Sequence, residues 1–241
     1  MKFSTFQKKL ISLFMRSDKK VLFFGRYGDI FSKRVYNFLL KRFNKVNCVW
    51  SKKSKENKIN NHNFDNVDLL ISFRSYYIFK KKHLSKINNL CLNFHPGPPK
   101  YRGFGCANYA IYNKDNFYGV TAHIINEKID KGKILDVKKF KIGKAISLKK
   151  LLNLAHNKQV LQVKDLINKL IKINFDHKKI KENFKNNYKW SSKLGSKEKL
   201  DKFYEIKNIG NSKEFKLKIR ATKIDTFKPF AIVKGKKVYI K

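Results

Sequence analysis

The chain is 241 residues long, which is enough for one large domain or for one domain with a small appendage. Hydrophobic residues make up 42% of the sequence and charged residues 31%. This balance excludes an intrinsically disordered chain and predicts a buried core. No apolar run approaches the roughly 20 residues that a membrane-spanning helix needs, so we expect no membrane span.

The formal net charge of +40 raises the question of nucleic-acid binding, because Lys and Arg side chains that neutralise phosphates release counterions. The basic residues are spread along the chain without a concentrated block. The joint excess of Lys, Asn, Ile and Phe is typical of coding bias in an AT-rich genome. We therefore interpret the charge as a genomic bias and do not expect nucleic acid as a partner, although the field would attract an anionic substrate.

Three cysteines, Cys48, Cys91 and Cys106, are an odd number without CxxC spacing. They are typical of buried thiols in a reducing compartment, so we expect a cytoplasmic protein. Residues 1–19 are predicted to form an N-terminal helical extension, because apolar side chains recur there at helical spacing. This helix is expected to contact the body or a partner, with a membrane-surface helix as the alternative.

Strands and helices are predicted to alternate through the first part of the chain. Strands are expected at 20–25, 46–50, 67–73 and 90–95, and helices at 30–43 and 78–86, with a polar loop at 51–66. Such alternation predicts an α/β fold with a parallel sheet, in which ligands bind beyond the carboxyl ends of the strands. The turn at 25–28 lacks the three-glycine phosphate fingerprint, so a dinucleotide cofactor is not expected.

The next part of the chain is predicted to complete this core. A helix is expected at 105–113, followed by strands at 120–126 and 133–140. Ser147 is a plausible N-cap for a long helix whose apolar residues follow the 3.6-residue period. This helix closes the core near residue 175.

A small β appendage is predicted after the core. Residues 176–212 are polar and are expected to be irregular, whereas the clean alternation at 215–222 predicts a strand. Residues 230–233 and 238–240 flank a Lys-Gly turn and predict a hairpin. The predicted domains are therefore an extension at 1–19, a core at 20–175, and a linker with a small β-hairpin region at 176–241.

Polar side chains gather where the fourth predicted strand ends. Asn93 and His95 lie two residues apart, so they point to the same face of the strand. The prolines and glycines that follow end the strand, and Asp130 comes later in an Ile-Asp-Lys-Gly turn. Each residue alone has an ordinary structural explanation, as a core histidine, a turn-capping asparagine or a turn aspartate. Together they favour a catalytic site.

These motifs resemble a known family. Asn93-Phe94-His95, Tyr101-Arg102-Gly103, Gly119-Val120-Thr121 and Ile129-Asp130-Lys131-Gly132 are similar to segments of the formyltetrahydrofolate-dependent formyltransferases, over roughly residues 20 to 170. The resemblance implies a Rossmann-like formyltransferase core with a mixed, mainly parallel sheet and a small C-terminal β appendage. It also implies an enzyme with Asn93, His95 and Asp130 as the catalytic set, 10-formyltetrahydrofolate as the formyl donor, no metal, and a homodimer.

The sequence is most similar to the branch of that family that formylates nucleotide-linked amino sugars. Gly97-Pro98-Pro99-Lys100 stands where the other branches usually have Ser-Leu-Leu-Pro, and the tail after the core is shorter than the added domain of methionyl-tRNA formyltransferases. The resemblance implies two sets of binding residues. Those for the folate are Arg74, Tyr77, Ile78, Phe79 and Ile125, and those for the sugar nucleotide are Gly97, Pro98, Tyr101, Arg102 and Gly105.

The expected function is formylation of a dTDP-linked amino-dideoxysugar, with 4-amino-4,6-dideoxyglucose favoured, for surface polysaccharide (O-antigen) synthesis. Transfer passes through an oxyanion, for which Asn93 and His95 would be donors worth about 3–4 kcal/mol each. Asp130 would orient His95 or accept the amine proton through water. The alternatives are a methionyl-tRNA formyltransferase-like enzyme and a non-catalytic basic nucleic-acid-binding protein.

Four further residues have two interpretations each. His123 lies on a strand beside the site, where it lines the site or belongs to the core. Arg102 binds a pyrophosphate or is solvated. Trp190 and Tyr204 stack on a nucleotide base or merely hold a loop in place. The other histidines lie in polar or helical surface contexts, and no function is expected for them.

Overall fold

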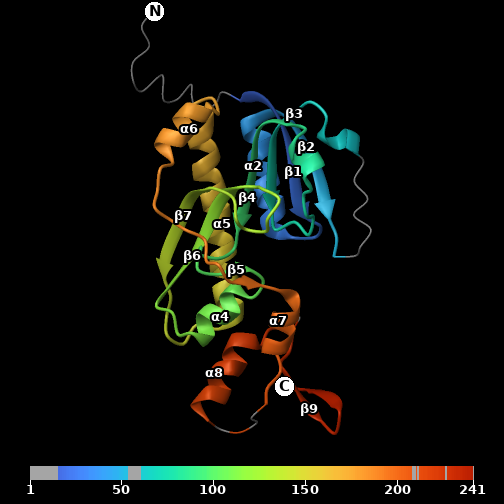
Figure 1. Ribbon diagram of the computed structural model, residues 1–241, viewed down its shortest axis with the longest axis vertical. Helices are drawn as coiled ribbons and strands as arrows, with labels where there is room; N and C mark the ends of the chain where they lie inside the picture. Colours follow the sequence, from blue (N-terminus) through green and yellow to red (C-terminus); the bar gives the residue numbers. More distant parts are fainter. Residues whose placement is uncertain (1–15, 54–60, 208–209, 211, 226, 241) are drawn as a thin grey trace, which may run out of the picture. The chain divides into compact units, whose positions relative to one another are not determined.

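The computed structural model describes residues 16–53, 61–207, 210, 212–225 and 227–240 (Figure 1). Its strands are β1 (Ser17–Arg26), β2 (Phe43–Ser51), β3 (Val67–Phe73), β4 (Ile87–His95), β5 (Arg102–Gly103), β6 (Phe117–Ile124), β7 (Ile134–Lys141), β8 (Leu194–Gly195), β9 (Phe230–Val233) and β10 (Lys236–Tyr239). Its helices are α2 (Ile30–Arg42), η1 (Asn61–Phe64), α3 (Lys81–Leu84), α4 (Cys106–Tyr112), α5 (Leu148–Lys172), α6 (His177–Asn183), α7 (Lys197–Phe203) and α8 (Lys213–Thr222).

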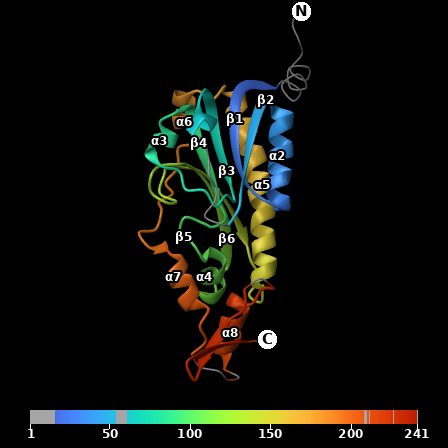
Figure 2. The ribbon, with the colours of Figure 1, turned by 90° about the vertical axis from the view of Figure 1, so that its right-hand side faces the viewer.

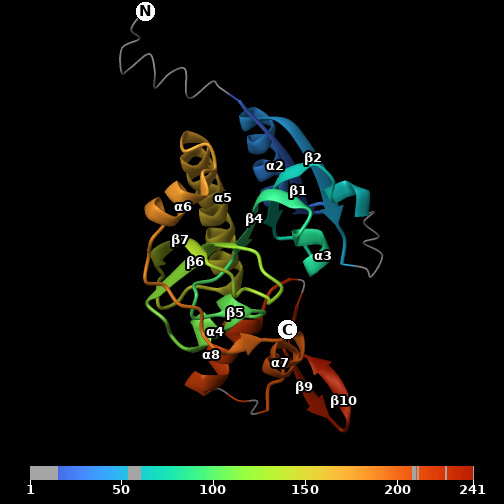
Figure 3. The same cartoon turned by 45° about the horizontal axis from the view of Figure 1, so that its top comes forward.

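The main sheet has six strands in the order β2-β1-β3-β4-β6-β7. Strand β1 pairs in parallel with both β2 and β3, and β3 pairs in parallel with β4, so the carboxyl ends of these strands meet at one edge. Strands β9 and β10 form a separate antiparallel hairpin, which Figure 3 shows as two adjacent strands. The predicted α/β class is therefore confirmed, with its mainly parallel sheet and small C-terminal β appendage.

The chain divides into two compact units that interleave in sequence. The first unit holds the residues up to His95 together with Ala122–Asp136 and Val160–Asn187, and the second holds Pro96–Thr121, Val137–Gln159 and Tyr188–Lys241. Strands β6 and β7 and helix α5 therefore each contribute to both units. The domain boundaries predicted from the sequence stay a prediction.

In the first unit, the strands alternate between two apolar clusters. Phe23 of β1 lies in a cluster with residues of α2 and α5, whereas its neighbour Phe24 lies in a second cluster with residues around α3. Both phenylalanines are fully buried. This is the period-2 pattern of a sheet covered on both faces, and Figure 2 shows α2 and α3 on opposite sides of the strands.

The second unit has an apolar cluster of its own. Ala107 and Ala110 of α4 and Leu151 of α5 are buried in it, and Ala221 brings α8 into the same cluster. The amide nitrogen of Asn108 donates to the carbonyl oxygen of Ala221 at 2.8 Å. Helix α8 is therefore attached to α4 by both apolar and polar contacts.

Two expectations for the C-terminal part were wrong. Residues 215–222 lie in helix α8 and not in a strand, because Ser212 caps the helix by accepting from the backbone N–H of Phe215 at 3.1 Å. The segment 176–212 is not simply irregular, since it contains the short helices α6 and α7. The predicted hairpin of β9 and β10 is confirmed, and the helix predicted for the N-terminal extension lies largely outside the described residues.

Two further observations concern the described helices and the cysteines. Among the described helices, none combines the length and apolarity that crossing a membrane requires. The three cysteines are free thiols, and burial raises the pKa of both Cys48 and Cys91 to about 12. A thiol with such a pKa is a poor nucleophile, so we assign these two cysteines no chemistry.

Candidate active site

Strand β4 brings Asn93 and His95 to the carboxyl edge of the parallel strands. In β4, Leu92 and Phe94 are buried in the apolar cluster shared with α2 and α5. The intervening Asn93 and His95 must therefore point to the other face. Asn93 pairs with Ser72 of the neighbouring strand β3, and Ser72 is the residue before the last one of β3. Asn93 is therefore level with the carboxyl end of β3.

A tight loop between β6 and β7 presents Asp130. Its backbone is strained, because Asp130 has a φ of +44°, in the left-handed region that residues with a side chain rarely adopt. The backbone N–H of Ile124 closes the loop by donating to the carbonyl oxygen of Lys133 at 2.9 Å. A Cβ atom on Gly132 would collide with the carbonyl oxygen of Ile124, so this position requires glycine.

The carboxylate of Asp130 is shared by two histidines and one asparagine. Its Oδ2 lies 3.1 Å from Nδ1 of His95, and its Oδ1 lies 3.4 Å from both Nδ2 of Asn93 and Nε2 of His123. The exposed fractions are 2% for His95, 3% for His123 and 9% for Asp130. The three residues predicted to be catalytic are therefore brought together in one polar cluster, with His123 as a fourth member, and all of them are buried except Asn93, which is half-buried.

His123 determines which way the Asn93 amide faces. Nδ1 of His123 lies 2.8 Å from the carbonyl oxygen of Ile124, which can only accept, so Nδ1 carries a hydrogen. In the neutral ring Nε2 is then an acceptor, and it lies 3.0 Å from the amide nitrogen of Asn93. Of the two interpretations of His123, the structure supports a place within the site.

Neighbouring side chains stabilise the negative charge of the Asp130 carboxylate. Burial alone would raise the pKa of the carboxyl, but the charge and the hydrogen bond of His95 outweigh it, and His123 acts in the same direction when its ring is protonated, so the pKa of Asp130 is well below its usual range. The carboxylate therefore accepts from Nδ1–H of His95. This leaves Nε2 of His95 as the nitrogen that can take up or give a proton.

The residues predicted to contact folate all lie in the first unit. Tyr77 and Phe79 belong to the apolar cluster around α3, whereas the side chain of Ile78 between them is 65% exposed. The backbone N–H of Ile125 donates to the carbonyl oxygen of Cys91 at 2.8 Å. Burial and the nearby Arg26 lower the pKa of Arg74 to about 10, against the opposing effect of Asp29.

The residues predicted to contact the sugar nucleotide all lie in the second unit. The carbonyl oxygen of Gly97 accepts from the Thr121 hydroxyl at 2.7 Å, and Pro98 follows in the same loop. The hydroxyl of Tyr101 donates to Asp115 at 2.8 Å. Gly105 caps α4 with a φ of +80°.

The structure decides between the two interpretations of Tyr204, excludes one interpretation of Arg102, and corrects the expected surroundings of His83. Arg102 is buried and donates to the carbonyl oxygen of Ser191 at 3.0 Å, so it is not a solvated arginine. Tyr204 is buried and its hydroxyl accepts from Asn108 at 3.2 Å, so it holds chain segments together rather than offering a face to a base. His83 is buried against the ring of Phe64 and is not a surface residue.

Within the described residues, no group of three or more His, Cys, Asp or Glu side chains has the arrangement of a metal site. The cluster around Asp130 instead resembles a hydrogen-bonded acid–base set. It joins a carboxylate, an imidazole that the carboxylate orients, and an amide donor, which together can move a proton and stabilise an oxyanion.

A model of the formyl transferase family matches residues 33–163, which is more than half of the chain. The chain belongs to the formyl transferase family. The resemblance found in its motifs is thereby confirmed. The matched region contains Asn93, His95, His123 and Asp130.

Individual relatives come from more than one branch of this family. Methionyl-tRNA formyltransferase of Finegoldia magna is 35% identical over 107 residues, which cover 44% of this chain but only 33% of that protein. A sugar N-formyltransferase from a Shewanella species has a similar structure, with a TM-score of 0.73 and 19% identity over 92% of this chain and 96% of that one.

A further similar structure is that of an N-formyltransferase from Helicobacter canadensis, in complex with folinic acid and dTDP-3-aminofucose. Its TM-score is 0.67, with 18% identity over 91% of this chain and 86% of that one. At such identities these two structures establish the shared fold.

Proposed function

We propose that the protein transfers a formyl group from 10-formyltetrahydrofolate to the amine of a dTDP-linked amino-dideoxysugar, with dTDP-4-amino-4,6-dideoxyglucose as the first acceptor to test. The product would serve surface polysaccharide (O-antigen) synthesis, and the reaction would take place in the cytoplasm. The observation that carries the proposal is the buried cluster in which Asp130 contacts His95, Asn93 and His123. The structural similarity to sugar N-formyltransferases over nearly the whole chain supports the choice of acceptor.

The cluster provides the groups that formyl transfer needs. Attack of an amine on the formyl carbon places negative charge on the formyl oxygen and makes the amine nitrogen acidic. The amide of Asn93 can donate to that oxygen, because its contact with Asp130 is 3.4 Å long and holds the hydrogen only weakly. Nε2 of His95 can donate to the oxygen or carry a proton, while Asp130 holds the opposite nitrogen at 3.1 Å.

The segment 74–79 fits the pterin ring of a folate. Because Ile78 is exposed and its backbone has no hydrogen bond within the described residues, its N–H and C=O can pair with a ring of alternating donors and acceptors. Tyr77 and Phe79 hold the segment in place by their contacts with Phe24, at ring-centroid distances of 5.2 and 4.8 Å. When bound, 10-formyltetrahydrofolate supplies the formyl group.

The test is tetrahydrofolate release from 10-formyltetrahydrofolate with dTDP-4-amino-4,6-dideoxyglucose as acceptor, measured beside methionyl-tRNA. We expect turnover with the sugar nucleotide and near-complete loss in Asn93→Ala and in His95→Ala, with the circular dichroism spectrum unchanged. His156→Ala, on α5, is the matched control and should retain activity. Turnover by the Asn93→Ala variant at the wild-type rate would contradict the catalytic assignment.

A methionyl-tRNA acceptor is the second candidate. It is favoured by the sequence similarity to methionyl-tRNA formyltransferases and by the net charge of +40, which would attract RNA. Turnover with methionyl-tRNA alone would establish it in place of the sugar nucleotide. Oligonucleotide binding without any turnover would instead favour a non-catalytic nucleic-acid-binding protein.

We also propose a homodimer formed through the β9–β10 hairpin. Val233 and Val238 share one face of the hairpin and are 47% and 50% exposed, so this face offers apolar surface to a second copy of the chain. Light scattering should give the mass of a dimer for the wild type and for a Lys234→Gln control. Val238→Lys should give a monomer, and a wild-type monomer would overturn this assembly.

A further inference from the structure

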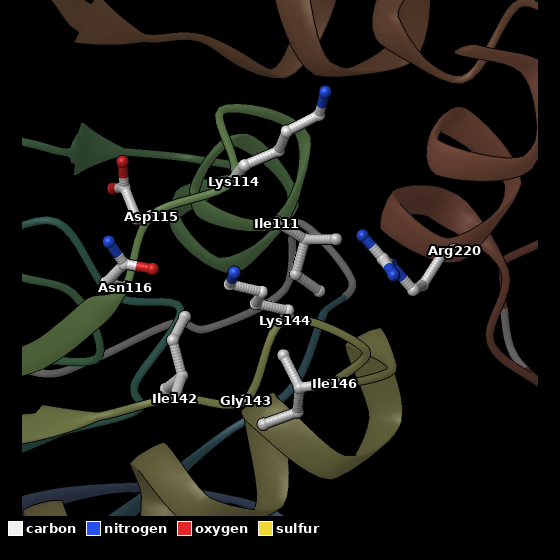
Figure 4. A pocket seen from close by; sticks show the side chains of 9 residues that line it. All are labelled: Ile111, Lys114, Asp115, Asn116, Ile142, Gly143, Lys144, Ile146 and Arg220. Carbon is white, nitrogen blue, oxygen red and sulfur yellow. The ribbon is translucent and has the colours of Figure 1, made fainter. Parts of the chain in front are cut away.

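A pocket lies within the second unit. None of its lining residues is assigned above to catalysis or substrate binding. One of them, Asp115, contacts such a residue, because it accepts from the hydroxyl of Tyr101. Its volume is about 250 Å³. The wall is made by the end of α4, the start of β6, the turn between β7 and α5, and helix α8, as Figure 4 shows. The lining residues are Ile111, Lys114, Asp115, Asn116, Ile142, Gly143, Lys144, Ile146 and Arg220.

The polar part of this wall is strongly cationic. Lys114, Lys144 and Arg220 contribute three positive charges, and none of them forms an ion pair with another described residue. The single carboxylate, Asp115, is already neutralised, because Lys100 donates to its two oxygens at 2.8 and 3.1 Å and Tyr101 donates at 2.8 Å. The pocket therefore carries a positive charge that no described side chain balances.

Arg220 is the residue of the wall that most directly indicates a ligand. Figure 4 shows its guanidinium reaching from α8 into the pocket, toward Ile111 and Lys144. Its Nε atom is buried and has no hydrogen-bond partner among the described residues. A buried N–H without an acceptor is costly, and a guanidinium is shaped to donate two parallel hydrogen bonds to a phosphate or carboxylate.

Hydrogen-bonded backbone holds the segments that carry the cationic side chains of the pocket wall. The backbone N–H of Ile142 donates to the carbonyl oxygen of Asn116 at 3.0 Å, which joins the end of β7 to the start of β6. Lys114 has a φ of +54°, and its N–H donates to Ile111 at 3.0 Å in the turn that ends α4. Arg220 lies in the last turn of α8. Arg220 and Lys114, two of the three cationic residues, therefore lie in hydrogen-bonded segments of the wall.

The rest of the wall is apolar. Ile111, Ile142 and Ile146 form its hydrophobic part, with Ile111 and Ile142 almost fully buried. An inorganic anion would leave this surface without a partner, whereas an organic group on the anion would cover it. The volume lies just below the range of about 300–1,000 Å³ that is typical for drug-sized ligands, so the organic group must be small.

We propose that this pocket binds a small organic phosphate monoester, with the phosphate on Arg220, Lys114 and Lys144 and the organic group against the three isoleucines. A dianionic phosphate matches three cations better than a single carboxylate does, because each charge adds a Coulomb attraction. The ligand would be separate from the donor and the acceptor of formyl transfer. The proposal does not depend on which acceptor the enzyme uses.

The probe is phenyl phosphate, titrated calorimetrically into the full chain, with isoleucine methyl NMR spectra recorded in parallel. We expect one molecule bound per chain and shifts concentrated on Ile111, Ile142 and Ile146. Arg220→Gln should weaken binding at least tenfold. Lys216→Gln, which removes an exposed charge from the same helix, is the matched control and should bind like the wild type.

Lys144→Met provides a second variant in case Arg220→Gln does not fold, since Lys144 is exposed and its loss should leave the fold intact. It should weaken phenyl phosphate binding as well. Equal binding by all variants, or shifts scattered over the molecule, would overturn the proposal in favour of general attraction to the net positive surface. Inorganic phosphate or benzoate binding as tightly as phenyl phosphate would overturn the assigned ligand class.

Discussion

At the scale of single residues, Asp130 links stability to pH. Its pKa is lowered in the folded protein, so the unfolded chain binds a proton at higher pH than the folded chain does. The stability that it contributes is therefore fully present above the unfolded pKa of about 3.9 and is lost as the pH falls below it toward the lower folded pKa.

Comparison of the wild type with Asp130→Asn tests this linkage. Urea unfolding should show the wild type more stable than the variant above about pH 5, with the difference shrinking as the pH falls below about 4. Asp136→Asn is the control, because Asp136 accepts from Gln162 but has no histidine partner among its described contacts. A difference between wild type and Asp130→Asn that stays constant with pH would contradict the lowered pKa.

A second residue-scale prediction concerns His123 as a positioning residue. His123→Phe removes the acceptor that faces the Asn93 amide at 3.0 Å, so the amide loses its preferred orientation. We expect kcat to fall roughly tenfold, the equivalent of one hydrogen bond, while KM changes little. In the Asn93→Ala background the same substitution should have no further effect. An undiminished effect there would show that His123 acts independently of Asn93.

Three of the four cluster residues could be predicted from the sequence because their positions follow from local rules. Side chains alternate along β4, which places Asn93 and His95 on one face. The Asp-Lys-Gly residues at 130–132 are typical of a turn and predict a loop. The function of His123 could not be decided, because it depends on how β6 lies against β4. The solvated interpretation of Arg102 failed for a related reason, since its acceptor Ser191 is 89 residues away.

At the scale of elements, the loop that carries Asp130 depends on Gly132. Gly132→Ala would push a methyl group into the carbonyl oxygen of Ile124, and the loop must move to avoid it. We expect a destabilisation of about 1–3 kcal/mol and a larger relative loss of activity, because Asp130 moves with the loop. Thermal unfolding and turnover measure the two effects.

Gly143→Ala is the matched control for this loop, because a Cβ there meets nothing within 4 Å. It should leave both stability and turnover near the wild-type values. If Gly132→Ala behaved in the same way, the tight closure of the 124–133 loop would be unnecessary for positioning Asp130.

Helix α8 shows why an element can be mispredicted. Phe215, Leu217, Ile219 and Ala221 alternate with polar residues, which is the pattern of a half-buried strand. Leu217 and Ala221 are also four residues apart, and both lie in the apolar cluster of the second unit. The two patterns coincide over such a short segment, so the N-cap at Ser212 and the contacts with α4 decide the outcome.

At the scale of the whole molecule, the sheet was predictable and the division into units was not. Alternating strands and helices imply parallel pairing, and the three registered parallel pairs follow that rule. The units interleave because β6, β7 and α5 each contribute to both. A domain prediction that divides the sequence into consecutive segments cannot describe these units, because it assigns each strand or helix to a single domain.

The net charge of +40 leads to the last prediction, which concerns ionic strength. The proposed sugar nucleotide is dianionic and would approach through the field of the whole chain. Raising the ionic strength from about 0.01 to 0.1 M shortens the screening length from about 30 to 10 Å. We expect kcat/KM to fall several-fold over this range. In contrast, kcat should change little, because the buried contacts around Asp130 are screened much less than surface charges are.

The measurement is a salt series of initial rates with the sugar nucleotide, using circular dichroism to check folding at each concentration. A parallel fall in kcat and kcat/KM would mean that salt acts on the catalytic cluster itself. A kcat/KM independent of salt would mean that charges spread this evenly give no net steering toward the site. In that case the basic composition would have no function in substrate capture, as the coding-bias interpretation in its simplest form requires.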